Sequence, residues 1–193
     1  SAPSAAFLRQ LGWREFSYHL VDVFPQMATT PWKPAFAEFP WEWNSDGSVP
    51  VWQHGLTGVD LVDAAMNELW LTGFMHNRAR MVVASYLTKN LLQHWRQGED
   101  WFWDTLVDAD PAVNAVSWQW VAGSGPDAAP YFRILSPARQ QERFDPKRRY
   151  INRWLPVNDL RPVAPTESEL KSDRQRALDA YELMRHRAES RAE

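Results

Sequence analysis

The chain has 193 residues, with 21 basic and 24 acidic side chains and a formal charge of −3. This length fits one domain, and the charge excludes a global basic field for nucleic acid. The absence of cysteine excludes disulfides, thiolate metal sites and a cysteine nucleophile, and it fits a reducing cytosol. No apolar run approaches the roughly 18 residues of a membrane span, and the start does not read as a secretion signal.

Tryptophan is the unusual component, with 12 copies. Each indole brings a large apolar area together with an N–H group that needs a partner when it is buried. Such a content fits an aromatic core, and it also fits stacking platforms for bases or a relay for electrons. Composition alone leaves these three interpretations open.

The first predicted element is an amphipathic helix over about 5–23. Its core stripe comprises Phe7, Leu8, Leu11, Phe16, Leu20 and Val21. Within this helix, Trp13 and Arg14 fit either a rim indole beside a surface arginine or a ligand contact. Prolines spread over 25–50 exclude a long helix there and indicate an ordered loop. Aromatic residues anchor that loop: Trp32, Phe36, Phe39, Trp41 and Trp43.

Two helices are predicted next, over 61–72 and over about 76–97, each closed by a glycine, the second by Gly98. The first turn of the second helix carries Arg78 and Arg80, although helix N-termini prefer acidic side chains. These arginines either face solvent or meet acidic groups elsewhere in the fold.

The spacing of the histidines along the sequence does not indicate a metal site. His76 and His94 match no ligand motif, and cysteine and an HExxH helix are both absent. We therefore predict that the protein binds no metal.

The stretch 101–131 carries polar groups where a core helix would carry leucine. Short helices are predicted over 101–106 and 112–122, and the turn 123–126 either caps the second helix or cradles a phosphate. Buried carboxylates need partners, so this stretch is the candidate site for a polar ligand. Its singled-out residues are Asp108, Asp110, Asn114, Trp118 and Trp120.

The last third of the chain gathers positive charge. A helix is predicted to begin at Pro137, and the basic residues that follow are Arg139, Arg143, Lys147, Arg148, Arg149 and Arg153. They form either a solvated face or a strip for a phosphate backbone. A capping box at Thr166 begins a final charged helix to about 188, with a narrow apolar stripe. Because no convincing strand is found, the predicted fold class is all-α.

Three segments together resemble the photolyase/cryptochrome family, from about Phe7 to Pro156. They read FLRQLGWREFSYHL, then DAAMNELWLTGFMHNRARMVVASYLTKNLLQHWRQGEDWFWDTLVDADPAVNAVSWQWVAGSGPDAAPYFRI, then RQQERFDPKRRYINRWLP. Among relatives, the resemblance is greatest to bacterial cyclobutane pyrimidine dimer photolyases. It implies a helical domain that holds FAD in a folded, U-shaped form, in a DNA-associated protein of the bacterial cytoplasm.

The resemblance also implies a set of flavin contacts. The stretch from Asp108 to Asp110 would hydrogen-bond the flavin ring, and Asn114 would lie against flavin N5, where repair enzymes have asparagine. Arg80 would pair with Asp108 in a buried ion pair, which would explain its position in the helix. Asn77 would face both cofactor and lesion.

The implied substrate is DNA containing a pyrimidine dimer. Trp13 and Trp120 match the indoles that flank the flipped dimer, and Met81 matches a methionine beneath it. Arg14 and Gln140 match DNA-contacting positions. The implied reaction is light-driven electron transfer from reduced FAD to the dimer, splitting of the ring and return of the electron, without a metal.

A tryptophan relay is the last implied feature. Trp118, Trp95 and Trp43 match the chain of indoles that carries electrons from the surface to the photoexcited flavin. Trp43 is the member of the three that lies near an insertion or deletion relative to the family.

The chain departs from the family pattern in two ways. It contains nothing that corresponds to the N-terminal α/β antenna domain or to the first helices of the flavin domain, which clamp the FAD phosphates. We therefore expect a separate chain or a missing N-terminal part to complete the flavin site, and without it weak FAD binding and exposed apolar helix faces. Gln10 stands where many dimer photolyases have glutamate, which leaves the lesion type open.

Two alternatives to repair stay open, a cryptochrome-like blue-light sensor and a non-catalytic remnant of the fold. The expected domain organisation is a partial FAD-binding helical domain over 1–165, followed by a charged amphipathic helix over 166–193 that packs on it.

Overall fold

The computed structural model describes residues 2–126, 132–155 and 162–191, and within these ranges the all-α prediction is confirmed. The α-helices are α1 (Ala2–Val23), α2 (Ser48–Gln53), α3 (Asp60–Thr72), α4 (Asn77–Ser85), α5 (Trp95–Thr105), α6 (Pro111–Ala122), α7 (Pro137–Phe144), α8 (Arg149–Trp154) and α9 (Glu167–Glu189). Two 3-10 turns, η1 (Pro25–Ala28) and η2 (Pro34–Glu38), and a π-turn, η3 (Tyr86–Asn90), complete the described helical elements. An isolated parallel bridge joins Glu42 to Gln93.

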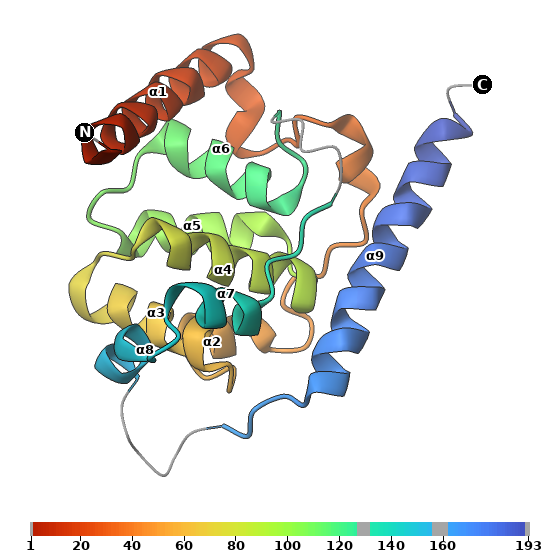
Figure 1. Cartoon of the computed structure of the whole chain (residues 1–193). Coiled ribbons are helices and arrows are strands. Elements are labelled where there is room, and N and C mark those ends of the chain that lie inside the picture. The colour runs from red at the N-terminus through yellow and green to blue at the C-terminus, as the bar shows by residue number, and fades with distance from the viewer. Residues whose placement is uncertain (1, 127–131, 156–161, 192–193) are drawn as a thin grey trace.

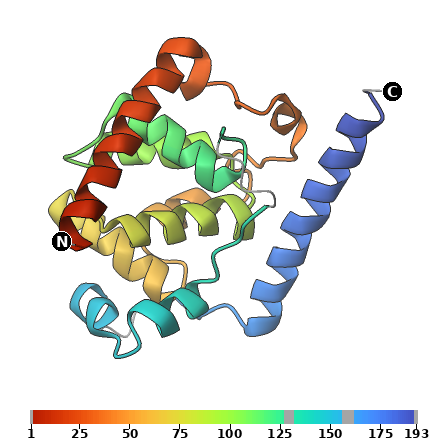
Figure 2. The same cartoon turned by 45° about the horizontal axis from the view of Figure 1, so that its top comes forward.

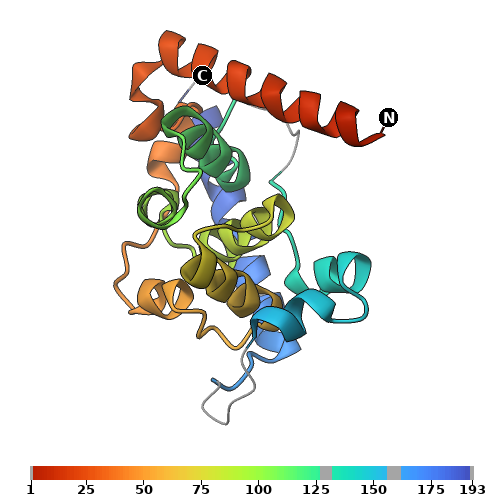
Figure 3. The ribbon, with the colours of Figure 1, turned by 90° about the vertical axis from the view of Figure 1, so that its left-hand side faces the viewer.

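Helix α6 packs against α1, α4 and α5. Helix α1 lies across one end of the molecule and packs on α6, while α3 and α8 pack together at the other end (Figure 1). Helices α4 and α5 lie between these ends, and α9 runs along one side, where it covers η2 and η3 (Figures 1 and 2). Figure 3 shows the N-terminal end of α1 and helix α7 projecting on the same side of the molecule.

The core is built largely from large aromatic and aliphatic side chains. The main cluster contains Trp52, Met66, Leu69, Val83, Leu87, Trp95, Trp118 and Ile151, all nearly or completely buried. A second cluster under α9 contains Phe36, Phe39, Leu92, Phe132, Ala177 and Met184. The narrow apolar stripe predicted for the last helix therefore packs into this cluster, through Ala177 and Met184.

The predicted helix ends are confirmed where the signal is local. Gly73 and Gly123 close α3 and α6 with positive φ angles of 68° and 96°, which a residue with a Cβ atom adopts only with strain. Ser136 caps α7 ahead of its first-position proline. Thr166 caps α9 in the predicted capping box.

The predicted helix over 76–97 is wrong in its second half. The α-helix ends at Ser85, the π-turn η3 follows, and Leu92 takes a positive φ of 52° before α5 begins. Gly98 therefore lies inside α5 and does not end a helix. A Cβ atom at Gly98 would lie 2.1 Å from a ring carbon of Trp118, so glycine is needed there to admit the indole.

The first helix also differs from its prediction. Leu20 is buried, but Phe7 and Leu8 are 63% and 64% exposed. The apolar stripe predicted as a core face thus lies largely on the surface of the described chain. The predicted loop over 25–50 is interrupted by η1 and η2, and it ends in the first turn of α2.

Candidate functional site

The predicted flavin contacts lie where the first turn of α4 meets the loop between α5 and α6. The Arg80 guanidinium donates through Nη2 to both carboxylate oxygens of Asp108, at 3.0 and 2.9 Å, and through Nε to the backbone oxygen of Met75 at 2.6 Å. The expected pairing is therefore present. Its side chains are 23% and 50% exposed, so this ion pair is half open to solvent and not buried as predicted.

The start of α6 holds the other polar residues of the cluster. Asp110 caps the helix, because its Oδ1 accepts from the backbone N–H groups of Ala112 and Val113 at 3.0 and 2.9 Å. Its Oδ2 accepts the Tyr18 hydroxyl at 3.0 Å, which ties α1 to α6. One turn later, the nearly buried Asn114 donates through Nδ2 to a backbone oxygen of α5 at 3.0 Å.

That backbone oxygen belongs to Glu99, which is itself a perturbed group. Burial raises the pKa of Glu99 to about 7, and neighbouring Asp100 also acts to raise it. A carboxyl group that changes charge near neutral pH therefore belongs to the same residue whose backbone oxygen holds the Asn114 amide. The sequence gives no signal for this perturbation, because it depends on how α5 packs against α6.

The predicted DNA-facing residues come from several helices. Trp13, Arg14 and Gln10 are exposed on α1, and Trp13 is 46% exposed with its ring against Phe16. From α4, Asn77 is exposed and Met81 is half-buried. Trp120 on α6 and Gln140 on α7 are half-buried, and the Gln140 Oε1 atom is buried without a hydrogen-bond partner.

The three predicted relay residues differ sharply in burial. Trp95 and Trp118 are 0% and 2% exposed, whereas Trp43 is 60% exposed. The indole nitrogens of both buried residues have no hydrogen-bond partner. Trp118 packs over Gly98, about one helical turn after Trp95 on α5. The structure thus places two indoles in the core beside α5 and the third at the surface.

A histidine ring connects the surface and core indoles. The imidazole of His94 stacks on Trp43, with ring centres 4.2 Å apart and planes 18° apart. Its distance to the ring of Trp95 is 5.5 Å, with planes 28° apart. Burial, and then the neighbouring charge of Arg96, lower the pKa of His94 to about 4, so the ring is neutral at pH 7.

Both histidines considered for metal binding cap helices. His76 and His94 accept the backbone N–H of the residue two positions later through Nδ1, each at 3.2 Å, at the starts of α4 and α5. Within the described ranges, no group of three or more histidine, aspartate or glutamate residues could hold a metal ion. In the same ranges, no helix is long and apolar enough to cross a membrane.

The basic residues after Pro137 divide into separate roles. Arg148 is bonded to Asp60 and directly precedes α8, so it does not belong to an open strip. Arg143 lies 5.1 Å from the ring centre of Phe144, and Arg78 of α4 lies 4.2 Å from the same ring. Arg78, the second misplaced arginine, therefore meets an aromatic face instead of an acid.

Sequence reasoning missed two buried polar residues that fix α6. Gln119 is fully buried and binds η1 and the loop after it, because its Nε2 donates to the backbone oxygens of Met27 and Thr30 at 2.6 and 2.9 Å. Lys89 is fully buried in η3 and donates to the backbone oxygens of Val121 and Ala122 at 2.6 and 3.0 Å. A glutamine between two tryptophans was the signal for the first, but nothing local marks the second.

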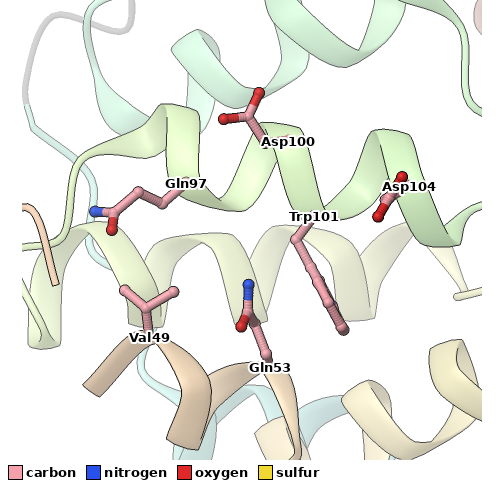
Figure 4. Close-up of a pocket in the computed structure, with 6 residues that line it drawn as sticks. All are labelled: Val49, Gln53, Gln97, Asp100, Trp101 and Asp104. Carbon is pink, nitrogen blue, oxygen red and sulfur yellow. The ribbon is translucent and has the colours of Figure 1, made fainter. Parts of the chain in front are cut away.

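A separate pocket of about 300 Å³ lies between α2 and α5 (Figure 4). Its lining residues are Val49, Gln53, Gln97, Asp100, Trp101 and Asp104. None of them is a predicted flavin or DNA contact, so the pocket is distinct from the polar cluster around Arg80.

The fold and the cluster define a helical domain with a polar site at the junction of α4, α5 and α6. Residues 7–183 match the family described as the FAD binding domain of DNA photolyase. The chain belongs to this family.

Similar proteins agree with this placement. The deoxyribodipyrimidine photo-lyase of Agrobacterium fabrum is 52% identical over 78% of this chain, which covers 31% of that protein. The protein of the same name from Thermus thermophilus is 49% identical over 78% of this chain, with 36% of its own length covered. This chain therefore spans about a third of the length of these curated relatives.

Solved structures show the same relation. A class III photolyase from Agrobacterium tumefaciens superposes with a TM-score of 0.87 at 40% identity, over 96% of this chain and 44% of that one. A Synechocystis cryptochrome superposes with a TM-score of 0.78 at 29% identity, over 91% and 42%. The fold is thus shared by a photolyase and a cryptochrome.

Proposed function

We propose that this chain is the flavin- and lesion-binding part of a deoxyribodipyrimidine photolyase, which repairs pyrimidine dimers in DNA with light. The observation that carries the proposal is the ion pair in which Arg80 Nη2 donates to both carboxylate oxygens of Asp108, in a chain that belongs to this family. The resemblance predicted that bond between residues 28 positions apart. It joins α4 to the start of α6, the two elements that carry Asn77 and Asn114.

The chemistry of the donor set suits FAD. The pyrimidine edge of a flavin presents both hydrogen-bond donors and acceptors, and the half-open pair of Arg80 with Asp108 offers both, while Asn114 in the first turn of α6 adds a side-chain amide. We assign these three residues and Asn77 to the cofactor. Asp110 contributes indirectly, because its side chain caps α6 and so fixes the direction of that helix. When bound, reduced FAD supplies the light-excited electron that splits the dimer.

The remaining assigned residues bind the substrate. Trp13 and Trp120 offer aromatic faces on which an extruded dimer can stack, and Met81 gives an apolar floor. Arg14 and Gln140 contact the DNA strand, and Gln10 faces the lesion. The exposure of Trp13, at 46%, leaves its ring available to a base.

With FAD bound, the relay residues would pass electrons inward, one at a time, to the photoexcited flavin as their acceptor. Trp118 and Trp95 have buried indole N–H groups without a partner, so an oxidised ring at either place cannot easily lose its proton. The hole therefore passes outward to Trp43, whose exposed indole can release its proton to water. A thiol in solution then returns one electron to Trp43.

Flavin retention tests the proposal. The chain is incubated with FAD and desalted, and its absorption spectrum is recorded before and after blue light with a reductant. Because this chain alone is expected to bind FAD weakly, we expect a structured flavin band that bleaches while FAD is in excess, a smaller band after desalting, and less retained flavin still for Asp108→Asn. Asp104→Asn is the matched control, because Asp104 is an exposed aspartate outside the cluster. No retained flavin would refute FAD binding by this chain alone and require a further segment or chain to close the site.

Repair is tested on an oligonucleotide that carries one cyclobutane dimer. We expect the FAD-loaded, chemically reduced chain to split the dimer under blue light, and Trp13→Ala to lose repair while keeping flavin. Bound flavin without any repair would favour the cryptochrome-like sensor instead.

A further inference from the structure

The strongest unassigned feature of the molecule is the ring of His94. It lies between an exposed indole and a buried one, and no other described side chain touches both rings in this stacked manner. Trp41, the other aromatic residue beside it, contacts the imidazole edge-on at 5.7 Å. The three stacked rings form a continuous aromatic column from solvent to core.

The backbone around this column is held tightly. Glu42 donates to the backbone oxygen of Leu92 and accepts from the N–H of His94, each at 2.9 Å. The N–H of Asn44 binds the side chain of the fully buried Gln93 at 2.7 Å. Residues on both sides of Trp43 are therefore bonded to the segment that leads into His94, so the backbone of Trp43 is fixed and only its side-chain torsions can take the indole off the imidazole.

The geometry points to His94 as a positioning residue of the electron relay, which fixes Trp43 against the core and completes the aromatic path to Trp95. This inference rests on the proposed function, because the path matters only if electrons use it. One electron passes from the Trp43 indole through this contact to oxidised Trp95, which becomes neutral again. Trp43 is left oxidised, and a thiol in solution reduces it.

The charge state of the ring supports this role. The same Nδ1 atom that could take up a proton accepts the backbone N–H of Arg96, and burial disfavours a charged imidazole. A neutral ring does not repel the positive charge that passes between Trp95 and Trp43. A lysine or a protonated histidine at this position would oppose that charge.

Two substitutions separate stacking from helix capping. His94→Asn removes the ring but keeps a side-chain oxygen that caps α5 well. His94→Phe keeps a ring and loses the cap. If His94 serves only as a cap, the asparagine variant behaves as the parent and the phenylalanine variant is impaired. If it positions Trp43, the order is reversed.

The first readout needs no flavin. The chain is labelled with 5-fluorotryptophan, and the Trp43 resonance is identified by its loss in Trp43→Phe. We expect this resonance to move toward the position of an exposed indole in His94→Asn, and to stay shifted by ring stacking in His94→Phe. An unmoved resonance in His94→Asn would overturn the inference.

The second readout is the rate of flavin photoreduction in the FAD-loaded chain with dithiothreitol. Loss of one aromatic stacking contact lowers the equilibrium constant for docking of Trp43 by about two- to tenfold, and the rate in His94→Asn should fall by up to that factor. His94→Phe should recover most of it. A parental rate in His94→Asn, with Trp43→Phe slow, would also refute the role. If Trp95→Phe and Trp118→Phe photoreduce flavin at the parental rate, the proposed relay is wrong. The fluorine shift still shows whether His94 holds the Trp43 indole.

Discussion

Two glycines inside helices should respond oppositely to the same substitution. Gly98 lies in α5 against Trp118, and Gly12 lies in α1 with nothing within 4 Å of a Cβ atom. Alanine is favoured over glycine in a helix by about 1 kcal/mol. Gly12→Ala should therefore stabilise the chain by about 0.5–1 kcal/mol, because it gains helix propensity and meets no obstacle.

Gly98→Ala should destabilise the chain despite that gain. Its Cβ atom would lie 2.1, 2.5 and 2.6 Å from three ring carbons of Trp118, which is 2% exposed. Overpacking of a core typically costs about 1–3 kcal/mol, and contacts this short place the cost at or above the upper end. After the gain of about 1 kcal/mol in propensity, we expect a net loss of about 2 kcal/mol.

Thermal and urea unfolding of the two variants test this reasoning. A loss of about 2 kcal/mol lowers the melting temperature of a chain of this size by about 4–8 °C, and Gly12→Ala should raise it slightly. The near-ultraviolet circular dichroism of Gly98→Ala should also change, because the Trp118 indole must move. A Gly98→Ala chain that is as stable as Gly12→Ala would refute the packing of Trp118 on α5.

Two buried polar contacts give further predictions. Burial lowers the pKa of Lys89 to about 7, while the unfolded lysine titrates near 10.5, so only the unfolded state binds this proton between those values. The free energy of unfolding should therefore rise from pH 7 to pH 10, and Lys89→Met should lose that part of the slope; equal slopes would contradict it. Tyr150→Phe removes the hydroxyl that donates to the nearly buried Glu68 carboxylate. It should lower stability by about 1–3 kcal/mol in urea titrations, and an unchanged midpoint would exclude that contact.

The parts of the fold that could be predicted from the sequence rest on local signals. Gly73 and Gly123 end helices because they take positive φ angles, and Thr166 begins one because its hydroxyl binds the backbone three residues on. The pair of Arg80 with Asp108 was predictable for a different reason. An arginine in the first turn of a helix is unfavourable without an acidic partner, and the family resemblance indicated that this partner is Asp108.

The break between α4 and α5 could not be predicted, because its cause lies elsewhere in the chain. The apolar periodicity continues through 86–97, but the π-turn η3 directs Lys89 inward to the last carbonyl groups of α6. Those carbonyl groups lack partners within their own helix, so a buried lysine side chain satisfies them. Leu92 then takes a left-handed conformation that a sequence pattern does not assign to leucine.

Helix α6 is held by polar contacts at both ends, and this explains how the candidate site keeps its geometry with a half-open ion pair. Asp110 fixes its first turn, and Lys89 fixes its last carbonyl groups. Gln119 ties its second half to η1 and the loop that follows. Because these contacts come from different parts of the chain, α6 can neither rotate nor slide without breaking several at once. Trp118 and Trp120, which lie two residues apart on this helix, are thereby fixed in different directions, and in the proposed function the first serves the relay and the second the lesion.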